Sequence, residues 1–283
     1  MNRYFFSSFL ALAMLFSGIG VPPAAAQNRQ ATAAAAAPAY EVPFVNRQLA
    51  NGLEVIVLPD SSVPLVTVEL AVRNGSFTEP PELNGLSHLY EHMFFQRNGA
   101  IGLFRCEMAR SYNRFDIFNQ ENCTEQMKLK SQIGDVSYLS ELDKAGYVRN
   151  GTTQEEYVNY FFSTTSEHLP TIMRYMRDAT LFPSFDEEEL NREIQVVLGE
   201  LDRQMSEPFY YLDRTLMDNL FYKHPTRKSP GGTRETVASA TTDKMRLIQS
   251  RYYVPNNSAL IVTGDVQPEA VFKLANELFS IWP

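Results

Sequence analysis

The pentapeptide His88-Leu89-Tyr90-Glu91-His92 constrains the fold of this chain more than any other feature. Positions i, i+3 and i+4 share one face of an α-helix, so the two histidines and Glu91 meet only if this segment is helical. The chain has only four histidines among 283 residues, which argues against an accidental cluster. Two neutral imidazoles can hold a zinc ion, and a carboxylate beside them can take a proton from water at the metal. The segment therefore predicts a helix with a zinc-binding face.

A third metal ligand is expected on a long amphipathic helix over residues 186–205. A catalytic zinc site needs three protein ligands and one position open to water. Glu193 and Glu200 are seven residues apart, about two helical turns, and so lie on one face among apolar neighbours. Taken alone, these acids could be ordinary solvated carboxylates. With His88 and His92 upstream, we interpret Glu200 as the third ligand and Glu193 as a carboxylate that orients one imidazole.

The first residues indicate an exported protein, and the overall charge bears on its partners. Residues 1–26 combine an early arginine, an apolar run and small residues of the Ala-x-Ala type, as in a secretory signal peptide. A membrane anchor is the alternative, but the run is short and broken for that role. Residues 27–42 are rich in Ala, Gln and Pro and predict a flexible leader. A formal charge of −8 without a basic run disfavours a nucleic-acid partner. We expect export to the bacterial periplasm, or secretion, without a stable membrane anchor.

Strand and helix patterns predict an α+β fold. Apolar and polar side chains alternate in short segments that are separated by turn signals such as Asn51-Gly52. Strands are expected over residues 45–49, 53–58, 66–72, 147–153, 157–163 and 258–263, and helices over 85–95, 136–145, 167–180, 186–205, 208–221, 242–252 and 268–279. Sequential hairpins with clustered helices indicate a largely antiparallel sheet with helices packed on one face.

Residues 97–134 differ from the rest of the chain, because they show no sustained period. They combine glycines, several aromatic residues and both cysteines of the protein, so we expect a long surface loop inserted into the domain. Cys106 and Cys123 could form a disulfide in an oxidising compartment or remain two buried thiols, and the sequence leaves both open.

Several motifs, in this order along the chain, resemble the pitrilysin, insulysin and mitochondrial processing peptidase family. They are residues 73–76, 85–95, 192–200, 252–257 and 262–266. The resemblance covers residues 43–283 and implies a catalytic zinc peptidase domain, folded like one half of a clamshell. It also implies that His88, His92 and Glu200 bind one Zn²⁺, that Glu91 is the general base, and that Glu193 is a supporting carboxylate.

The resemblance further implies how substrate binds. Family members hold a peptide as an extra strand on an exposed sheet edge, and residues 146–153 resemble that edge. Asn150, Gly151 and Thr152 would then contact the substrate. Without the resemblance, Asn150-Gly151 would instead indicate a hairpin turn.

Two departures from the family pattern bear on function. The gap between His92 and Glu200 is about 30 residues longer than in the better-known members, and we place the extra residues in 97–134. Members also have a second, similar half that closes the chamber and adds an Arg/Tyr pair, so we expect either that this sequence is a fragment or that a partner chain supplies that half. We expect a zinc metalloendopeptidase that hydrolyses peptides or unfolded polypeptides with a partner half. The alternative is a zinc- and peptide-binding subunit that is inactive alone.

Overall fold

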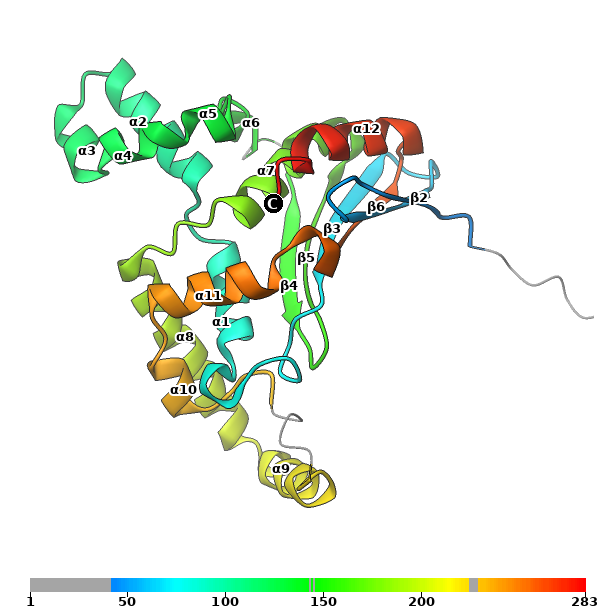
Figure 1. Ribbon diagram of the computed structural model, residues 1–283, viewed down its shortest axis with the longest axis vertical. Coiled ribbons are helices and arrows are strands. Elements are labelled where there is room, and N and C mark those ends of the chain that lie inside the picture. The colour runs from blue at the N-terminus through cyan, green and yellow to red at the C-terminus, as the bar shows by residue number, and fades with distance from the viewer. Residues whose placement is uncertain (1–41, 143, 145, 224–228) are drawn as a thin grey trace, which may run out of the picture. The chain divides into compact units, whose positions relative to one another are not determined.

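One six-stranded sheet organises the computed structural model, which describes residues 42–142, 144, 146–223 and 229–283 (Figure 1). In spatial order the strands are β1 (Val45–Gln48), β2 (Glu54–Pro59), β6 (Ser258–Gly264), β3 (Leu65–Val72), β5 (Val158–Thr165) and β4 (Val148–Thr153). β2 and β6 pair in parallel, and every other neighbouring pair is antiparallel. The largely antiparallel sheet is thereby confirmed, with β1 and β4 at its edges.

The two predicted N-terminal segments fall almost entirely outside the described residues. The signal peptide at 1–26 and the leader at 27–42, except for its last residue, therefore stay predictions. Within the described part of the chain, no helix is long and apolar enough to cross a membrane.

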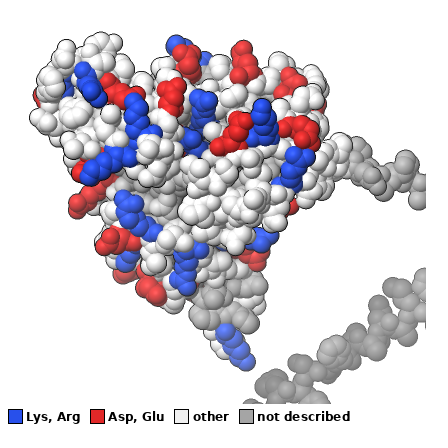
Figure 2. All heavy atoms as spheres, turned by 45° about the horizontal axis from the view of Figure 1, so that its top comes forward, with Lys and Arg blue, Asp and Glu red and all other residues white. Residues whose placement is uncertain are grey.

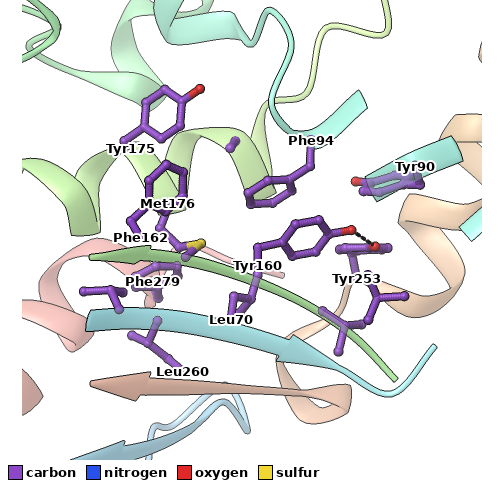
Figure 3. Packing of buried hydrophobic residues seen from close by; sticks show 14 of the residues in the cluster. Leu70, Tyr90, Phe94, Tyr160, Phe162, Tyr175, Met176, Tyr253, Leu260 and Phe279 are labelled. Atoms are coloured by element: carbon purple, nitrogen blue, oxygen red, sulfur yellow. Dashed lines mark hydrogen bonds between the residues drawn. The ribbon is translucent and has the colours of Figure 1, made fainter. Parts of the chain in front are cut away.

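The helices pack on one face of the sheet, as predicted. α12 (Pro268–Phe279) lies over β2, and α7 (Leu169–Leu181) lies over β3 and β5. α1 (Leu86–Phe94) lies over β5 and β4, where Phe94 stacks on Tyr160 with ring centroids 3.7 Å apart (Figure 3). The other face carries half-buried polar side chains such as Thr67 and Glu69. The covered face is therefore the core, and α1 sits above the β4 edge.

The start of α1 is fixed by a buried carboxylate and a close backbone contact. Glu79, which is 2% exposed, accepts hydrogen bonds from the backbone N–H groups of Gly85 (2.9 Å) and Ser87 (2.7 Å). Gly85 has φ +86°, and a Cβ there would lie 2.6 Å from the Cα of Gly232. Only glycine fits such a position without strain. Leu86, Leu89, Tyr90, Met93 and Phe94 then form the buried face of α1, so the opposite face is left to His88, Glu91 and His92.

α8 (Glu187–Ser206) is likewise positioned by a carboxylate at its start and by one apolar face. The Asp186 side chain accepts hydrogen bonds from two backbone N–H groups of the first turn and begins the helix. Its buried residues are Leu190, Ile194, Val197 and Leu201, spaced three to four apart. This apolar stripe fixes the helix against α1 and α10 (Arg234–Ala238) and turns Glu193 and Glu200 toward α1.

The prediction of a long surface loop over residues 97–134 is wrong, because most of this segment is helical. It contains α2 (Gly99–Ser111), α3 (Phe115–Gln120), α4 (Cys123–Gln126), η2 (Met127–Leu129) and α5 (Lys130–Ile133). The Asn98 side chain accepts a hydrogen bond from the Ile101 N–H at 3.0 Å and begins α2. A small separate core is formed by three residues of the segment and by Val136, which follows it: Ala100, Leu103, Ile133 and Val136. We call residues 97–134 the helical lobe.

The remaining described helices complete the fold. They are α6 (Leu139–Leu142), α9 (Pro208–Leu220), α11 (Thr242–Tyr252), η1 (Pro81–Leu83), η4 (Ser166–His168) and η5 (Pro255–Asn257). Acidic and basic side chains are interspersed over the described part of the face drawn in Figure 2.

Cys106 and Cys123 form a disulfide between α2 and α4, which decides the alternative that the sequence left open. The bond closes a short loop, because the two cysteines are 17 positions apart in sequence. Cys106→Ala combined with Cys123→Ala should lower the unfolding free energy of the lobe by about 3 kcal/mol, because the unfolded chain gains conformational freedom. Urea unfolding and hydrogen exchange of α2 and α4 measure this loss. The parent treated with a reductant should match the double variant, and a double variant as protected as the oxidised parent would contradict the prediction.

Candidate metal centre

Three predicted ligand atoms converge between α1 and α8. Nε2 of His88 and Nε2 of His92 each lie 3.6 Å from Oε2 of Glu200. Zinc bonds of about 2.0–2.1 Å in tetrahedral geometry hold ligand atoms about 3.4 Å apart, so this set fits a zinc ion. Among the described residues, no other group of three His, Cys, Asp or Glu side chains is close enough to hold a metal. The site is partly buried, with side-chain exposures of 19% for His88 and 17% for His92.

The electrostatics of the site favour a neutral imidazole at His88. Burial, with the charge of His92 as a second cause, lowers the pKa of His88 to about 4, while Glu200 acts in the opposite direction. His88 is therefore neutral at neutral pH and offers a free lone pair. Its Nδ1 atom has no hydrogen-bond partner among the described residues.

The carboxylate of Glu193 lies against the His92 imidazole. Glu193 Oε2 lies 3.0 Å from His92 Nδ1, and its other oxygen accepts a hydrogen bond from Gln96 Nε2 at 3.0 Å. With the proton on Nδ1, His92 donates to Glu193 and its Nε2 lone pair points toward Glu200. Gln96 follows His92 by four positions on the chain and was not among the predicted residues.

Glu91 lies beside the convergent ligands and contacts the edge strand. Its Oε2 atom accepts a hydrogen bond from the Thr153 hydroxyl at 2.6 Å. Burial raises the pKa of Glu91, and the Thr153 hydrogen bond and His92 partly oppose that rise. A cavity of about 410 Å³ opens here, lined by Glu91 and the three ligand residues together with Arg149 and Asn150. The arrangement can hold a cation beside a carboxylate able to exchange a proton.

The edge strand β4 presents alternate residues to the site. Asn150-Gly151 lies inside β4, so the alternative of a hairpin turn is wrong. Gly151 pairs with the buried Tyr160 and faces α1, where a Cβ would lie 2.7 Å from Glu91 Cγ. Side chains alternate along a strand, so those of Asn150 and Thr152 point to the opposite face. Asn150 nevertheless lines the cavity, and its Oδ1 accepts from the Gly151 N–H at 2.9 Å.

Arg149 and Thr153 share the site-facing side of β4 with Gly151, and neither was predicted. Both pair with buried residues of β5, namely Phe162 and Val158. The signal that would have found them was the alternation of β5, whose apolar residues mark the inner face of its neighbour. Of the two other histidines, His168 lies in η4, away from this group, and His224 is outside the described residues.

A family model and several known proteins match most of this chain. The family model described as "Insulinase (Peptidase family M16)" matches residues 55–100 and 124–233, more than half of the chain. The unmatched residues 101–123 lie within the helical lobe. A Bacillus subtilis protein described as an uncharacterized zinc protease, YmxG, is 26% identical over 216 residues, which are 76% of this chain and 45% of that protein.

Solved structures with the same fold include the first half of the periplasmic protease PqqL from Escherichia coli. It has a TM-score of 0.65 at 21% identity and covers 85% of this chain and 46% of that one. A peptidase M16 inactive domain from Pseudomonas fluorescens has a TM-score of 0.66 at 14% identity, over 85% of this chain and 51% of that one. This chain spans about half or less of the length of the curated relatives that it matches.

Proposed function

Because the chain belongs to the insulinase family of peptidases, family M16, we propose that it is the catalytic half of a zinc-dependent endopeptidase. Relatives described as zinc proteases make zinc the metal of the family. The observation that carries the proposal is the convergence of His88, His92 and Glu200 beside Glu91. The substrates would be peptides or unfolded polypeptides.

In this proposal each residue has a separate role in hydrolysis. A zinc ion held by His88, His92 and Glu200 supplies a Lewis acid that polarises a carbonyl and acidifies water. Glu91 accepts a proton from the attacking water and passes it to the leaving amine. Glu193 keeps His92 in the tautomer that binds metal.

The edge position of β4 supports recognition of an extended peptide. Among the described strands, β4 pairs with β5 alone, so its outer edge can pair with another strand. A peptide added there would be held by main-chain hydrogen bonds involving Asn150, Gly151 and Thr152 and would pass directly by Glu91. Such binding tolerates many side chains but requires an unfolded segment.

A second half-domain, in the same polypeptide or in a partner, would complete the chamber. The chain spans about half or less of its relatives' length, and α9 has no buried residue. Phe209, Leu212, Leu216 and Leu220 form a stripe on α9 and are each more than half exposed, which is typical of an interface. The alternative function, a zinc- and peptide-binding subunit inactive alone, is favoured by the likeness to a domain described as inactive. The complete set of ligands and base favours the peptidase.

Export to the periplasm, or secretion, fits this function. The signal-like residues 1–26, the disulfide between Cys106 and Cys123, and a structural neighbour described as periplasmic all support it. We further propose that the catalytic domain spans residues 43–283. The helical lobe, residues 97–134, would be an insertion that the better-known family members lack.

Zinc analysis combined with a peptidase assay tests the proposed function. The purified chain should carry about one zinc, and it should hydrolyse an unstructured fluorogenic peptide, alone or after addition of its second half-domain. Zinc and peptide binding without hydrolysis in either case would favour the alternative subunit. Absence of zinc binding would overturn both functions.

Glu193→Gln should weaken zinc binding by about 10- to 100-fold, because outer residues that orient a ligand have effects of this size. The carboxylate accepts from both His92 and Gln96, whereas an amide has one acceptor oxygen, so one of the two bonds is lost. Competition with a chromophoric chelator measures the change. The control is Glu188→Gln, because Glu188 is an exposed residue five positions earlier on the same helix. If both variants bind zinc with equal affinity, Glu193 does not have the proposed role.

A further inference from the structure

Thr153 connects the edge strand to the carboxylate of Glu91. Its hydroxyl donates to Glu91 Oε2 at 2.6 Å, across 62 residues of sequence, and both side chains are partly buried. A hydrogen bond of this length to a carboxylate belongs to the strong, charge-assisted class. No function assigned above uses this hydroxyl.

Thr153 is held more rigidly than the side chain it contacts. Its backbone pairs with Val158, a fully buried residue of β5, and a β-branched side chain is stiff at χ1. Glu91 is longer and has three rotatable bonds between the backbone and its carboxylate. The hydroxyl therefore acts as a fixed point that restrains a flexible acid.

The two oxygens of Glu91 meet β4 in different ways. Oε2 receives the Thr153 hydrogen bond, whereas Oε1 lies toward Gly151, where a Cβ would come within 3.0 Å of it. The Thr153 hydroxyl has one hydrogen and donates it in the hydrogen bond to Oε2. This leaves Oε1 as the oxygen available to take up a proton from water.

We propose that Thr153 is a positioning residue, which fixes the Glu91 carboxylate so that Oε1 is presented to the attacking water. The inference rests on the proposed function of Glu91 as general base. In the hydrolytic step the water proton moves to Oε1 and then to the leaving amine nitrogen, while the Thr153 O–H bond stays intact. β4 would thereby align both the peptide and the base, so that one strand sets their relative placement.

Thr153→Val tests the proposal because it removes the hydroxyl and keeps the shape of the side chain. We expect kcat to fall about 10- to 100-fold, which is the effect of losing one hydrogen bond to a charged group. KM and the zinc affinity should stay within about twofold, because Thr153 touches neither the metal ligands nor the outer edge of β4. Thr153→Ser should restore most of kcat.

Two further measurements separate positioning from a general structural effect. Thr67→Val removes a strand hydroxyl that bonds Ser163 at 2.7 Å on the opposite sheet face, and it should leave kcat unchanged. A crystal structure of zinc-loaded Thr153→Val should show the Glu91 carboxylate rotated or in two conformers, while Thr67→Val keeps the parental rotamer.

The outcomes distinguish this inference from the proposed function. Parental kcat in Thr153→Val, with an inactive Glu91→Gln, would overturn the role of Thr153 and leave the peptidase intact. Failure of Thr153→Ser to restore activity, or an unmoved Glu91 in Thr153→Val, would also overturn it. Hydrolysis by Glu91→Gln at the parental rate would instead remove the proposed function itself.

Discussion

Glu91→Gln is expected to lower kcat for peptide hydrolysis by about 100- to 10,000-fold, the usual contribution of a general base. Glutamine has the same shape and can still accept the Thr153 hydrogen bond, but its amide cannot take up the proton of the attacking water. The zinc ligands are untouched, so bound zinc should remain at the parental level. Assays with a fluorogenic peptide give kcat, and elemental analysis of the same sample gives zinc.

The control for Glu91→Gln is a glutamate of the same chain away from the cavity. Glu82→Gln in η1 removes one negative charge near the start of α1 and should keep the parental kcat. Peptide cleavage by Glu91→Gln at the rate of the Glu82 variant would show that Glu91 is not the base. Loss of zinc from Glu91→Gln would show that the residue serves the metal instead.

Glu200→Ala is expected to weaken zinc binding by more than about 100-fold, which exceeds the upper effect of residues that only orient a ligand. The substitution leaves His88 and His92 as the protein ligands, and two imidazoles do not complete a catalytic zinc site. Chelator competition followed by elemental analysis measures the loss, and peptidase activity should disappear with the metal.

A neighbouring substitution on α8 supplies the control for Glu200→Ala. Gln195→Ala changes an exposed side chain of the same helix and should bind zinc like the parent. Parental zinc affinity in Glu200→Ala would mean that the carboxylate merely lies near the imidazoles. An unfolded Glu200→Ala protein can be recognised by circular dichroism, and Glu200→Gln then replaces it as the test.

The convergence of these side chains between α1 and α8 could be predicted because the sequence information behind it is local. The spacing of His88, Glu91 and His92 requires one helix face, and the spacing of Glu193 and Glu200 requires another. Apolar residues on the opposite faces determine how α1 and α8 pack, so the ligands meet once the core forms. The helical period therefore predicts which side chains come together between the two helices.

The edge strand and the helical lobe were predicted less well, for different physical reasons. The resemblance named three consecutive residues of β4, whereas alternation along a strand brings only every second side chain to the site. In the lobe, α3, α4 and α5 have four to six residues each, too few for a helical period to be visible. The parallel pairing of β2 with β6 joins segments about 200 residues apart, and nothing in either segment specifies that partner.

The close contact between Gly85 and Gly232 has a consequence for motion. A methyl group at either position would collide with the other backbone, and Glu79 holds the first amides of α1 from the other side. Sliding or rotating α1 would break all of these contacts at once. If the proposed peptidase opens and closes around its substrate, α1 should therefore stay in place while other parts of the protein move.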